Sequence, residues 1–271
     1  MTIKFGLIGG GVMGEALLSR LITGGIYQGS EVIVSEPLES RRTFLQQQYG
    51  VNVTTDNFSV LNQSQEAVML AVKPQILSAI AQELADIFPL EHFPLIISIL
   101  AGVTLKNLEA AFPQLPVVRA MPNTPATVGG GMTAICLGAY TDNNHKQKAQ
   151  EIFTAVGEVA EVSENLMDAV TGVSGSGPAY VALMIEALSD GGVAAGLPRP
   201  IAKQLALQTV LGTAKLISET NIHPAELKDR VTSPGGTTIA AVSELEKAGF
   251  RSAIIQAVKA AAYRSQELGR Q

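Results

Sequence analysis

The run Gly9-Gly10-Gly11-Val12-Met13-Gly14 limits the possible folds more than any other segment, because it fits the pattern G-x-G-x-x-G. It follows a predicted strand, Lys4 to Ile8, and directly precedes a helical pattern. Glycines allow a tight turn, and the N-terminus of the next helix offers unpaired N–H groups to an anion. In this position the motif predicts a dinucleotide-binding turn. The alternative is a purely structural turn between strand and helix, which the third consecutive glycine, Gly10, favours.

Short apolar runs alternate with helical patterns in the first part of the chain, which predicts an α/β domain with a parallel sheet and crossover helices. The expected strands are Ile3 to Ile8, Glu31 to Val34, Ala67 to Val72, Leu95 to Ile99, Val117 to Ala120, Met132 to Leu137 and Val159 to Val162. The expected helices between them include Glu15 to Thr23, Ser40 to Tyr49 and Pro74 to Phe88.

After about Ser163 the strand patterns give way to Ala/Leu-rich segments with helical spacing, which predicts a second domain that is all-α. Its helices are expected at Pro178 to Ser189, Pro200 to Glu219, Ile239 to Ala248 and Arg251 to Leu268. We therefore expect a first domain at residues 1–163 and a second at residues 164–271.

The composition argues against two classes of binding partner, nucleic acids and membranes. Of the 271 residues, 46% are apolar and 16% are charged, and the net charge is -5. A negative chain with no Lys/Arg-rich run lacks the positive field of a nucleic-acid binder or of a protein that binds anionic membranes. No apolar stretch is long enough to span a bilayer. We expect binding to neither nucleic acid nor membrane, although a phosphate-bearing ligand could still occupy a local site.

The single cysteine, Cys136, cannot form an intrachain disulfide, and we expect a buried structural thiol rather than a nucleophile. His92, His145 and His223 are isolated in sequence, so no metal site is expected. We expect His92 and His145 in exposed loops and His223 at a turn. The N-terminal residues do not have the pattern of a signal or transit peptide, and a reducing, cytoplasmic setting is the expectation.

The end of the second strand should carry the residue that contacts the adenosine ribose, and Ser35 and Glu36 stand there. A carboxylate at Glu36 would accept hydrogen bonds from ribose hydroxyls and repel a 2′-phosphate. The Ser35 hydroxyl, with Arg41 or Arg42 nearby, could instead tolerate that phosphate. Both arginines could equally lie in a solvated first helical turn. The choice between NADH and NADPH stays open.

Several further loops are unusual. Ala71-Val72-Lys73-Pro74-Gln75 follows the third expected strand, and the segment Arg119 to Pro125 places two prolines around a polar stretch. Glycine-rich or polar segments follow at Val173 to Tyr180, Asp190 to Gly192 and Thr232 to Thr238. Together these motifs resemble the pyrroline-5-carboxylate reductase family, from Phe5 to about Leu268. The resemblance is most specific in Ala71 to Gln75, Met121 to Val128, Asp168 to Tyr180, Asp190 to Arg199 and His223 to Ile239.

The resemblance implies a Rossmann-type N-terminal domain, an all-α C-terminal domain that interlocks with a partner subunit, and proline biosynthesis in the cytoplasm. It assigns to the NADPH or NADH cofactor Ile8, Gly9, Gly11, Val12, Met13, Gly14, Ser35, Asn57, Ala71, Val72, Lys73 and Pro74. It assigns to the substrate, a cyclic imino acid, Glu164, Ser233, Gly236, Thr237 and Thr238. Glu36 departs from the small or basic residue that relatives often have beside the position of Ser35.

The segment Thr232 to Thr238 is a glycine-bearing turn followed at once by a helical pattern. We expect the backbone N–H groups of Gly236 to Thr238 to be free to bind a small carboxylate. The Thr238 hydroxyl could then contact a ring nitrogen next to that carboxylate, which makes Thr238 the candidate catalytic residue. Capping of the helix by Thr237 or Thr238 is the alternative.

Hydride addition to a C=N bond needs little acid–base help, because the imine can enter protonated, so positioning carries the catalysis. The sequence agrees, since no lysine occurs from Ala149 to Ala202. Hydroxyacid dehydrogenases of similar plan place a lysine general acid or base on the first long helix of their second domain, because their reaction moves a hydroxyl proton. The reaction that the family resemblance implies is reduction of L-1-pyrroline-5-carboxylate to L-proline.

Two other functions stay open: a dehydrogenase of the same plan acting on a small hydroxy or imino acid, and a catalytically silent dinucleotide sensor. The helical part also predicts self-association. Its helix at Pro200 to Glu219 carries more apolar surface than so small a set of helices can bury within itself. We expect a homodimer or a higher homo-oligomer.

Overall fold

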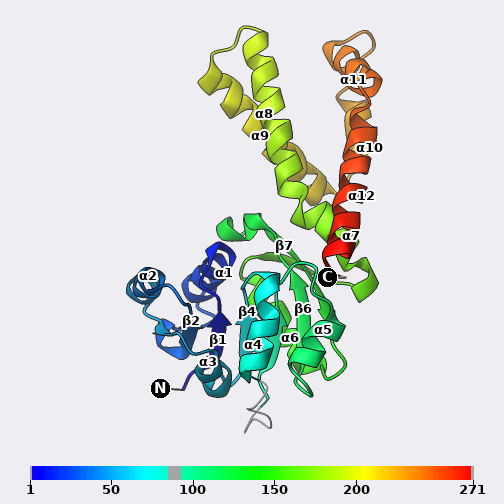
Figure 1. Ribbon diagram of the computed structural model, residues 1–271. Helices are drawn as coiled ribbons and strands as arrows, with labels where there is room; N and C mark the ends of the chain where they lie inside the picture. The colour runs from blue at the N-terminus through cyan, green and yellow to red at the C-terminus, as the bar shows by residue number, and fades with distance from the viewer. Residues whose placement is uncertain (1, 85–92, 270–271) are drawn as a thin grey trace. The chain divides into compact units, whose positions relative to one another are not determined.

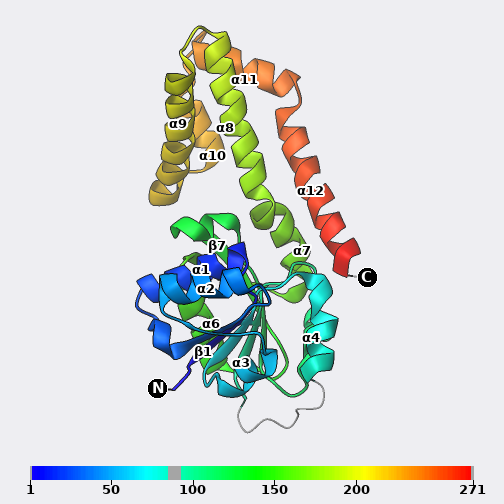
Figure 2. The same ribbon diagram turned by 60° about the vertical axis from the view of Figure 1, so that its left-hand side comes forward.

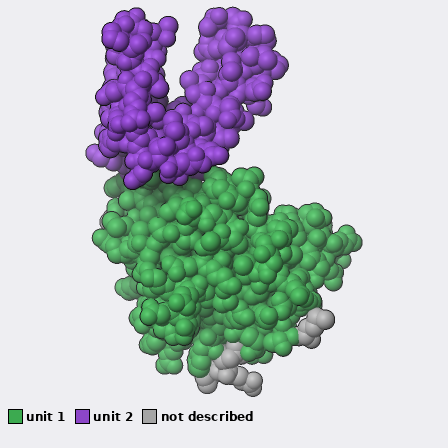
Figure 3. Space-filling model, turned by 180° about the vertical axis from the view of Figure 1, so that it is seen from behind, with its two compact units in different colours: residues 1–175, 260–271 green, residues 176–259 purple. Residues whose placement is uncertain are grey.

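A computed structural model describes residues 2–84 and 93–269 of the chain. The chain divides into two compact units (Figure 3), one of residues 1–175 and 260–271 and the other of residues 176–259. These units divide the chain differently from the predicted domains, since residues 164–175 and 260–271 group with the sheet. The domain boundary at residue 163 stays a prediction.

The first unit is built on a sheet whose described part has eight strands in the order β3-β2-β1-β4-β5-β6-β7-β8. The strands are β1 (Phe5–Ile8), β2 (Val32–Ser35), β3 (Asn52–Thr54), β4 (Ala67–Leu70), β5 (Leu95–Ser98), β6 (Val117–Met121), β7 (Gly131–Leu137) and β8 (Gly157–Glu161). The strands from β3 to β6 are all parallel, so their carboxyl ends share one edge of the sheet. This is the predicted α/β, Rossmann-type arrangement, in which ligands bind outside that edge.

Helices cover both faces of this sheet (Figure 1 and Figure 2). They are α1 (Val12–Thr23), α2 (Glu39–Tyr49), α3 (Asn57–Gln63), α4 (Leu77–Leu84), α5 (Leu105–Ala111) and α6 (Asn143–Thr154). Alternate strand residues point to opposite faces, as Leu7 and Ile8 do in β1. One core joins Leu7 to residues of α1, α2 and α6, whereas Ile8 packs with residues of α3, α4 and α5.

β7, the strand expected at Met132 to Leu137, extends the predicted parallel sheet but pairs with β6 in the antiparallel direction. Only residues 122–130 join the two strands, and they form the 3₁₀ helix Thr124–Val128. A parallel crossover needs a dozen or more residues, so a link this short reverses the chain. β8 then runs parallel to β7, because α6 supplies a full crossover between them.

Most predicted elements are present, and the missed ones are short or polar. β3 has only three residues, two of them polar. The predicted helix Pro74 to Phe88 begins as the 3₁₀ helix Pro74–Ile76 and continues as α4, and its residues 85–88 lie outside the described part of the chain. His145 is wrongly expected in a loop, since it stands in the first turn of α6 and its ring nitrogen accepts the N–H of Asp142.

Before the second unit the chain forms the 3₁₀ helix Glu164–Leu166, α7 (Met167–Val170) and the π-helix Thr171–Gly175. The second unit then contains α8 (Gly177–Ala194), α9 (Arg199–Thr220), α10 (Pro224–Arg230), α11 (Thr237–Lys247) and the first half of α12 (Phe250–Gly269). This confirms the all-α prediction. The second half of α12 belongs to the first unit, where the Ser265 hydroxyl donates to Asp168 Oδ1 at 2.6 Å.

The α8 and α9 helices pack closely where Gly192 meets Ala202. A Cβ on Gly192 would lie only 3.1 Å from the Ala202 methyl group. Ser189, Ala202 and Ala206 are the buried residues of this unit, and none is large. Many of its large apolar side chains are exposed to solvent in the single chain, with Leu211 at 59% and Leu205 at 52%. The described helices of this unit therefore do not bury their apolar surface within one chain.

Cys136 is buried in β7, as expected for a structural thiol. Burial raises the pKa of this thiol to about 11 and outweighs the nearby Arg119 charge, which lowers it. None of the helices in the described ranges combines the length and the apolar character that crossing a bilayer would take.

We expect Cys136 of the folded protein not to react with a thiol-specific disulfide reagent near pH 8, whereas the unfolded chain reacts at its one thiol. The free thiol ionises near its ordinary pKa of 9.0, but the buried one does so only at about 11. Its contribution to stability is present below pH 9.0 and is lost as the pH rises toward 11. The measurement is the rate of labelling with and without denaturant. Stoichiometric labelling of the folded protein near pH 8 would contradict the burial.

Candidate functional site

The turn between β1 and α1 uses its glycines for different purposes. Gly9 has φ +102°, and a Cβ on it would lie 2.7 Å from the carbonyl oxygen of Ala71. A Cβ on Gly14 would lie 2.3 Å from the carbonyl oxygen of Gly9, so Gly14 allows α1 to pack against the turn. At Gly11 the position of a Cβ is open, with no heavy atom within 4 Å. Gly11 thus leaves a space into which a pyrophosphate can approach the backbone, and these residues fit a dinucleotide.

The N-terminus of α1 faces this open space. Gly11 is its N-cap residue and supplies no side-chain hydrogen bond to the first turn. The first N–H groups of the helix are therefore available to an anion, which the positive end of the helix dipole also attracts. Glu15 lies in the same turn, but its carboxylate is held by the Arg41 guanidinium and by the Tyr49 hydroxyl. Burial opposes ionisation of Glu15, but these hydrogen bonds outweigh it and lower its pKa.

The peptide of Gly10 is held from both sides by the segment after β2. Its N–H donates to Glu36 Oε2 at 3.0 Å, and its carbonyl accepts from Arg41 Nε at 2.7 Å. A Cβ on Gly10 would lie 2.5 Å from the side chain of Leu45, so the packing of Leu45 explains why this position is also a glycine. The alternative that Arg41 lies in a solvated first helical turn is therefore wrong, because its guanidinium bonds to Gly10 and Glu15. Arg42 donates to the carbonyls of Glu36 and Pro37.

The other predicted cofactor residues lie at the same edge of the sheet. Ser35 ends β2, and its carbonyl accepts the N–H of Gly9. Ala71 follows β4, and its N–H donates to the carbonyl of Ile8. Lys73 is exposed and forms no ion pair within the described residues, so its ammonium is available to a ligand. Asn57 begins α3 and donates from Nδ2 to Glu83 Oε2 at 2.8 Å, a contact that the sequence did not indicate.

The loop after β6 is held rigidly by the side chain of Asn123. Its Oδ1 accepts the N–H of Met132 at 2.9 Å, and its Nδ2 donates to the carbonyl of Ser174 at 3.2 Å. These bonds tie the loop to the start of β7 and to the π-helix. A π-helix is an uncommon element that occurs often at functional sites. The polar stretch between two prolines therefore has a structural purpose at this edge of the sheet.

Glu164, a predicted substrate residue, already has partners. Its Oε1 accepts from Arg119 at 3.1 Å and from the N–H of Leu105 at the start of α5. Arg119 is only 5% exposed, so this ion pair provides a counter-charge for a buried guanidinium. The sequence contained a signal for the pair, because Arg119 is a charged residue inside an apolar strand pattern. A substrate role for Glu164 stays a prediction.

The N-terminus of α11 contains the other predicted substrate residues. Its N-cap is Gly236, and no side chain caps the helix. Capping by Thr237 or Thr238, the alternative, is therefore wrong: both stand inside the first turn, and their hydroxyls have no hydrogen-bond partner in the described part of the chain. The expectation of a free N–H is wrong for Gly236, because this group donates to the carbonyl of Ser233 at 3.0 Å. The first helical N–H groups, beginning with those of Thr237 and Thr238, have no intrahelical acceptor.

His223, expected to fix a turn, is the N-cap of α10, and its Nδ1 accepts the N–H of Ala225 at 3.2 Å. His92 lies outside the described residues. Within the described ranges, no group of three or more His, Cys, Asp or Glu residues is placed to hold a metal ion.

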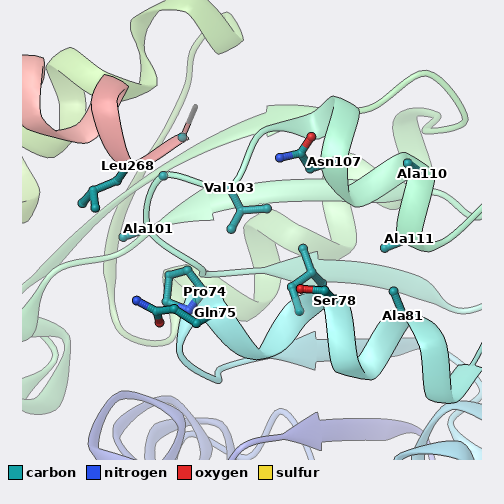
Figure 4. A pocket seen from close by; sticks show the side chains of 13 residues that line it. Pro74, Gln75, Ser78, Ala81, Ala101, Val103, Asn107, Ala110, Ala111 and Leu268 are labelled. Atoms are coloured by element: carbon teal, nitrogen blue, oxygen red, sulfur yellow. The ribbon is translucent and has the colours of Figure 1, made fainter. Parts of the chain in front are cut away.

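The first unit also contains a cavity of about 720 Å³ away from the glycine turn (Figure 4). It lies between α4, α5, the loop after β5 and the end of α12, with Ser78, Ala81, Val103, Asn107 and Leu268 among its lining residues. Of the predicted cofactor residues, only Pro74 lines it. The cavity is thus separate from the dinucleotide turn.

The glycine geometry predicts opposite effects for two similar substitutions. Gly11→Ala adds a methyl group to open space, so we expect the free energy of unfolding to change by less than about 0.5 kcal/mol. The same methyl group occupies the space for a phosphate, so dinucleotide affinity should fall about tenfold. Gly14→Ala should instead destabilise the fold by about 1–3 kcal/mol. Denaturant unfolding and fluorescence titration with coenzyme measure both. Unchanged coenzyme affinity in Gly11→Ala would show that no phosphate approaches there.

Comparison with known proteins identifies the family to which the chain is similar. Residues 164–268 match the family model for pyrroline-5-carboxylate reductase dimerisation, and residues 4–102 match that for NADP oxidoreductase, coenzyme F420-dependent. The chain is 62% identical over 270 residues to the pyrroline-5-carboxylate reductase of Synechocystis sp., covering 100% of both. It is 43% identical to that of Arabidopsis thaliana, covering 98% of this chain and 96% of the relative.

Solved structures agree. A pyrroline-5-carboxylate reductase from Coxiella burnetii superposes with a TM-score of 0.91 at 37% identity, covering 100% of both chains. The Plasmodium falciparum pyrroline carboxylate reductase, solved with NADP bound, gives a TM-score of 0.86 at 32% identity and covers 98% of both chains. With this identity over its whole length, the chain belongs to the pyrroline-5-carboxylate reductase family.

Proposed function

We propose that this protein reduces L-1-pyrroline-5-carboxylate to L-proline with NADPH or NADH, the last step of proline biosynthesis. Family membership supports this activity, and one structural observation carries it. The N-terminus of α11 lacks a side-chain cap, and the two threonine hydroxyls of its first turn have no hydrogen-bond partner among the described residues. Such a helix end suits a small carboxylate with a polar atom beside it.

The coenzyme is assigned to the carboxyl edge of the sheet. The open space at Gly11 and the N-terminus of α1 receive the pyrophosphate, and Ser35 and Asn57 lie toward the adenosine side. The loop after β4, with Ala71, Val72, Lys73 and Pro74, lies at the same edge. When bound, the reduced nicotinamide supplies the hydride that the imine carbon accepts.

The substrate is assigned to the turn before α11. The first N–H groups of this helix hold the carboxylate, with Ser233 and Gly236 shaping the turn. The Thr238 hydroxyl contacts the ring nitrogen and orients the C=N bond. The imine is protonated on its ring nitrogen before hydride adds to the carbon, so no side chain has to deliver a proton to that nitrogen, and these residues act by positioning. The absence of lysine from Ala149 to Ala202 fits this assignment and disfavours a hydroxyacid dehydrogenase.

Thr238→Ala should reduce kcat/KM for the imine about 10- to 100-fold, because it removes one hydrogen bond to a polar ring atom. Thr238→Ser keeps the hydroxyl and should retain most of the activity. The coenzyme affinity of both variants should equal that of the parent protein, because residue 238 is outside the dinucleotide turn. Steady-state kinetics with the imine and direct coenzyme titration separate the two effects. Full activity of Thr238→Ala, or oxidation of coenzyme only by keto acids, would overturn the assignment.

We also propose that the protein acts as a homodimer or a larger homo-oligomer in the cytoplasm. The exposed apolar residues of the second unit support association, because its helices bury only small residues within one chain. The single cysteine, which cannot form an intrachain disulfide, fits a reducing compartment.

Leu211→Glu should lower the oligomer mass, because it places a charge on an apolar helix face that we expect a second copy to cover. Gln47→Glu is the control, since it adds a negative charge at an exposed polar position of α2 in the first unit. Light scattering at micromolar concentration measures the mass of each. A parent protein that is a stable monomer under these conditions would refute the proposal.

A further inference from the structure

The chain leaves the first unit through an interrupted helix. The π-helix Thr171–Gly175 ends at the last residue of that unit, and α8 begins at Gly177 with Pro178 in its first turn. In an uninterrupted α-helix the N–H of residue 178 would donate to the carbonyl of residue 174, but proline has no N–H. The carbonyl of Ser174 therefore lacks its regular helical donor.

The side chain of Asn123 supplies a donor to this carbonyl. Its Nδ2 lies 3.2 Å from the Ser174 carbonyl oxygen and 3.4 Å from the Ser174 hydroxyl. The other end of the same amide, Oδ1, accepts the N–H of Met132 at 2.9 Å. Because an amide has a donor and an acceptor at fixed positions, these bonds set its orientation. Asn123 thus ties the exit of the chain to the loop after β6 and to the start of β7.

A second contact supports this tie. Met121 ends β6, and its terminal methyl group would lie 2.6 Å from a Cβ on Gly175. β6 runs parallel to β5, so its carboxyl end stands at the sheet edge to which the coenzyme is assigned. Two residues at this end of β6 therefore hold the last residues of the first unit at the coenzyme edge.

We propose that Asn123 is a positioning residue for hydride transfer, because it fixes the point where the chain passes from the coenzyme-binding unit toward the helices that hold the substrate. The proposal rests on the proposed function, which assigns the substrate to α11 in the second unit. Hydride transfer requires both reactants in one fixed geometry, whereas the binding of each ligand alone does not. A loosened exit should therefore slow the transfer without weakening either ligand.

Asn123→Ala in the full-length protein should lower kcat for the imine about 10- to 100-fold, because small displacements of the reactants are costly. The dissociation constants of the coenzyme and of proline, measured by calorimetry, should stay equal to those of the parent protein. Asn144→Ala is the matched control. It removes an exposed asparagine side chain of α6 that has no hydrogen bond among the described residues, so kcat should not change.

Pro178→Ala separates positioning from stability. It restores an N–H at residue 178, so the Ser174 carbonyl no longer depends on Asn123 for a donor. The double variant Asn123→Ala/Pro178→Ala should recover part of the denaturation midpoint that Asn123→Ala loses, but not its kcat. Pro178→Ala alone keeps the tie and should keep the kcat of the parent protein. Recovery of kcat in the double variant would overturn the proposal, because Asn123 would then serve only to satisfy a carbonyl group.

Hydrogen exchange tests the tie without the imine reaction. Backbone amides of residues 171–177 should exchange faster in Asn123→Ala than in the parent protein or in Asn144→Ala. If Asn123→Ala does not fold, Asn123→Asp replaces it, since a carboxylate keeps the acceptor for Met132 but has no N–H for Ser174.

Equal exchange, an unchanged kcat in Asn123→Ala, or a loss of coenzyme affinity as large as the loss of kcat would each overturn the role of Asn123. A parent protein that does not reduce the imine would refute the proposed function alone, and the exchange measurement would still decide whether Asn123 holds the exit of the chain.

Discussion

The close approach of the turn after β1 to the end of β4 is the contact on which the rest of the first unit depends. Gly9 lies against the carbonyl of Ala71, and Gly14 lies against the carbonyl of Gly9, at separations that no side chain allows. This packing seats α1 on the sheet and aims its N-terminus at the carboxyl edge. The backbone bonds from Gly9 to Ser35 and from Ala71 to Ile8 bring three strand ends together there. Segments more than sixty positions apart, such as Ile8 and Ala71, thus form one ligand-binding edge.

Much of this fold could be predicted because its strands are short apolar runs bounded by glycine or polar turns. The failures have physical causes. β3 is a three-residue segment at the sheet edge, too short to show a pattern. α6 begins with polar residues and buries only Ala149, Ile152 and Phe153, so its apolar stripe is narrow. The direction of β7 depends on the length of the link before it rather than on any residue of the strand.

The features of the candidate site likewise fall into those that the sequence could predict and those that it could not. The glycine turn could be recognised because each glycine meets a local requirement that the sequence pattern records. The bonds from Glu36 and Arg41 to Gly10 could not, because they join positions 26 and 31 residues apart whose side chains have several other uses. The pairing of Arg119 with Glu164 spans 45 residues and needs the packed sheet to bring them together. The uncapped start of α11 was obscured by a simpler local rule, since threonine before a helix commonly caps it.

The second unit is inserted into the first, since the chain leaves the sheet unit after residue 175 and returns to it at residue 260. The returning half of α12 is held there by Ser265 on Asp168, and its end lies against the loop at Gly102, with a Cβ on Gly269 only 2.6 Å from the Gly102 carbonyl oxygen. After a single backbone break between residues 175 and 176, each of the two fragments would carry a part of the first unit. We therefore expect the two fragments to reassemble without a covalent link, as in fragment complementation.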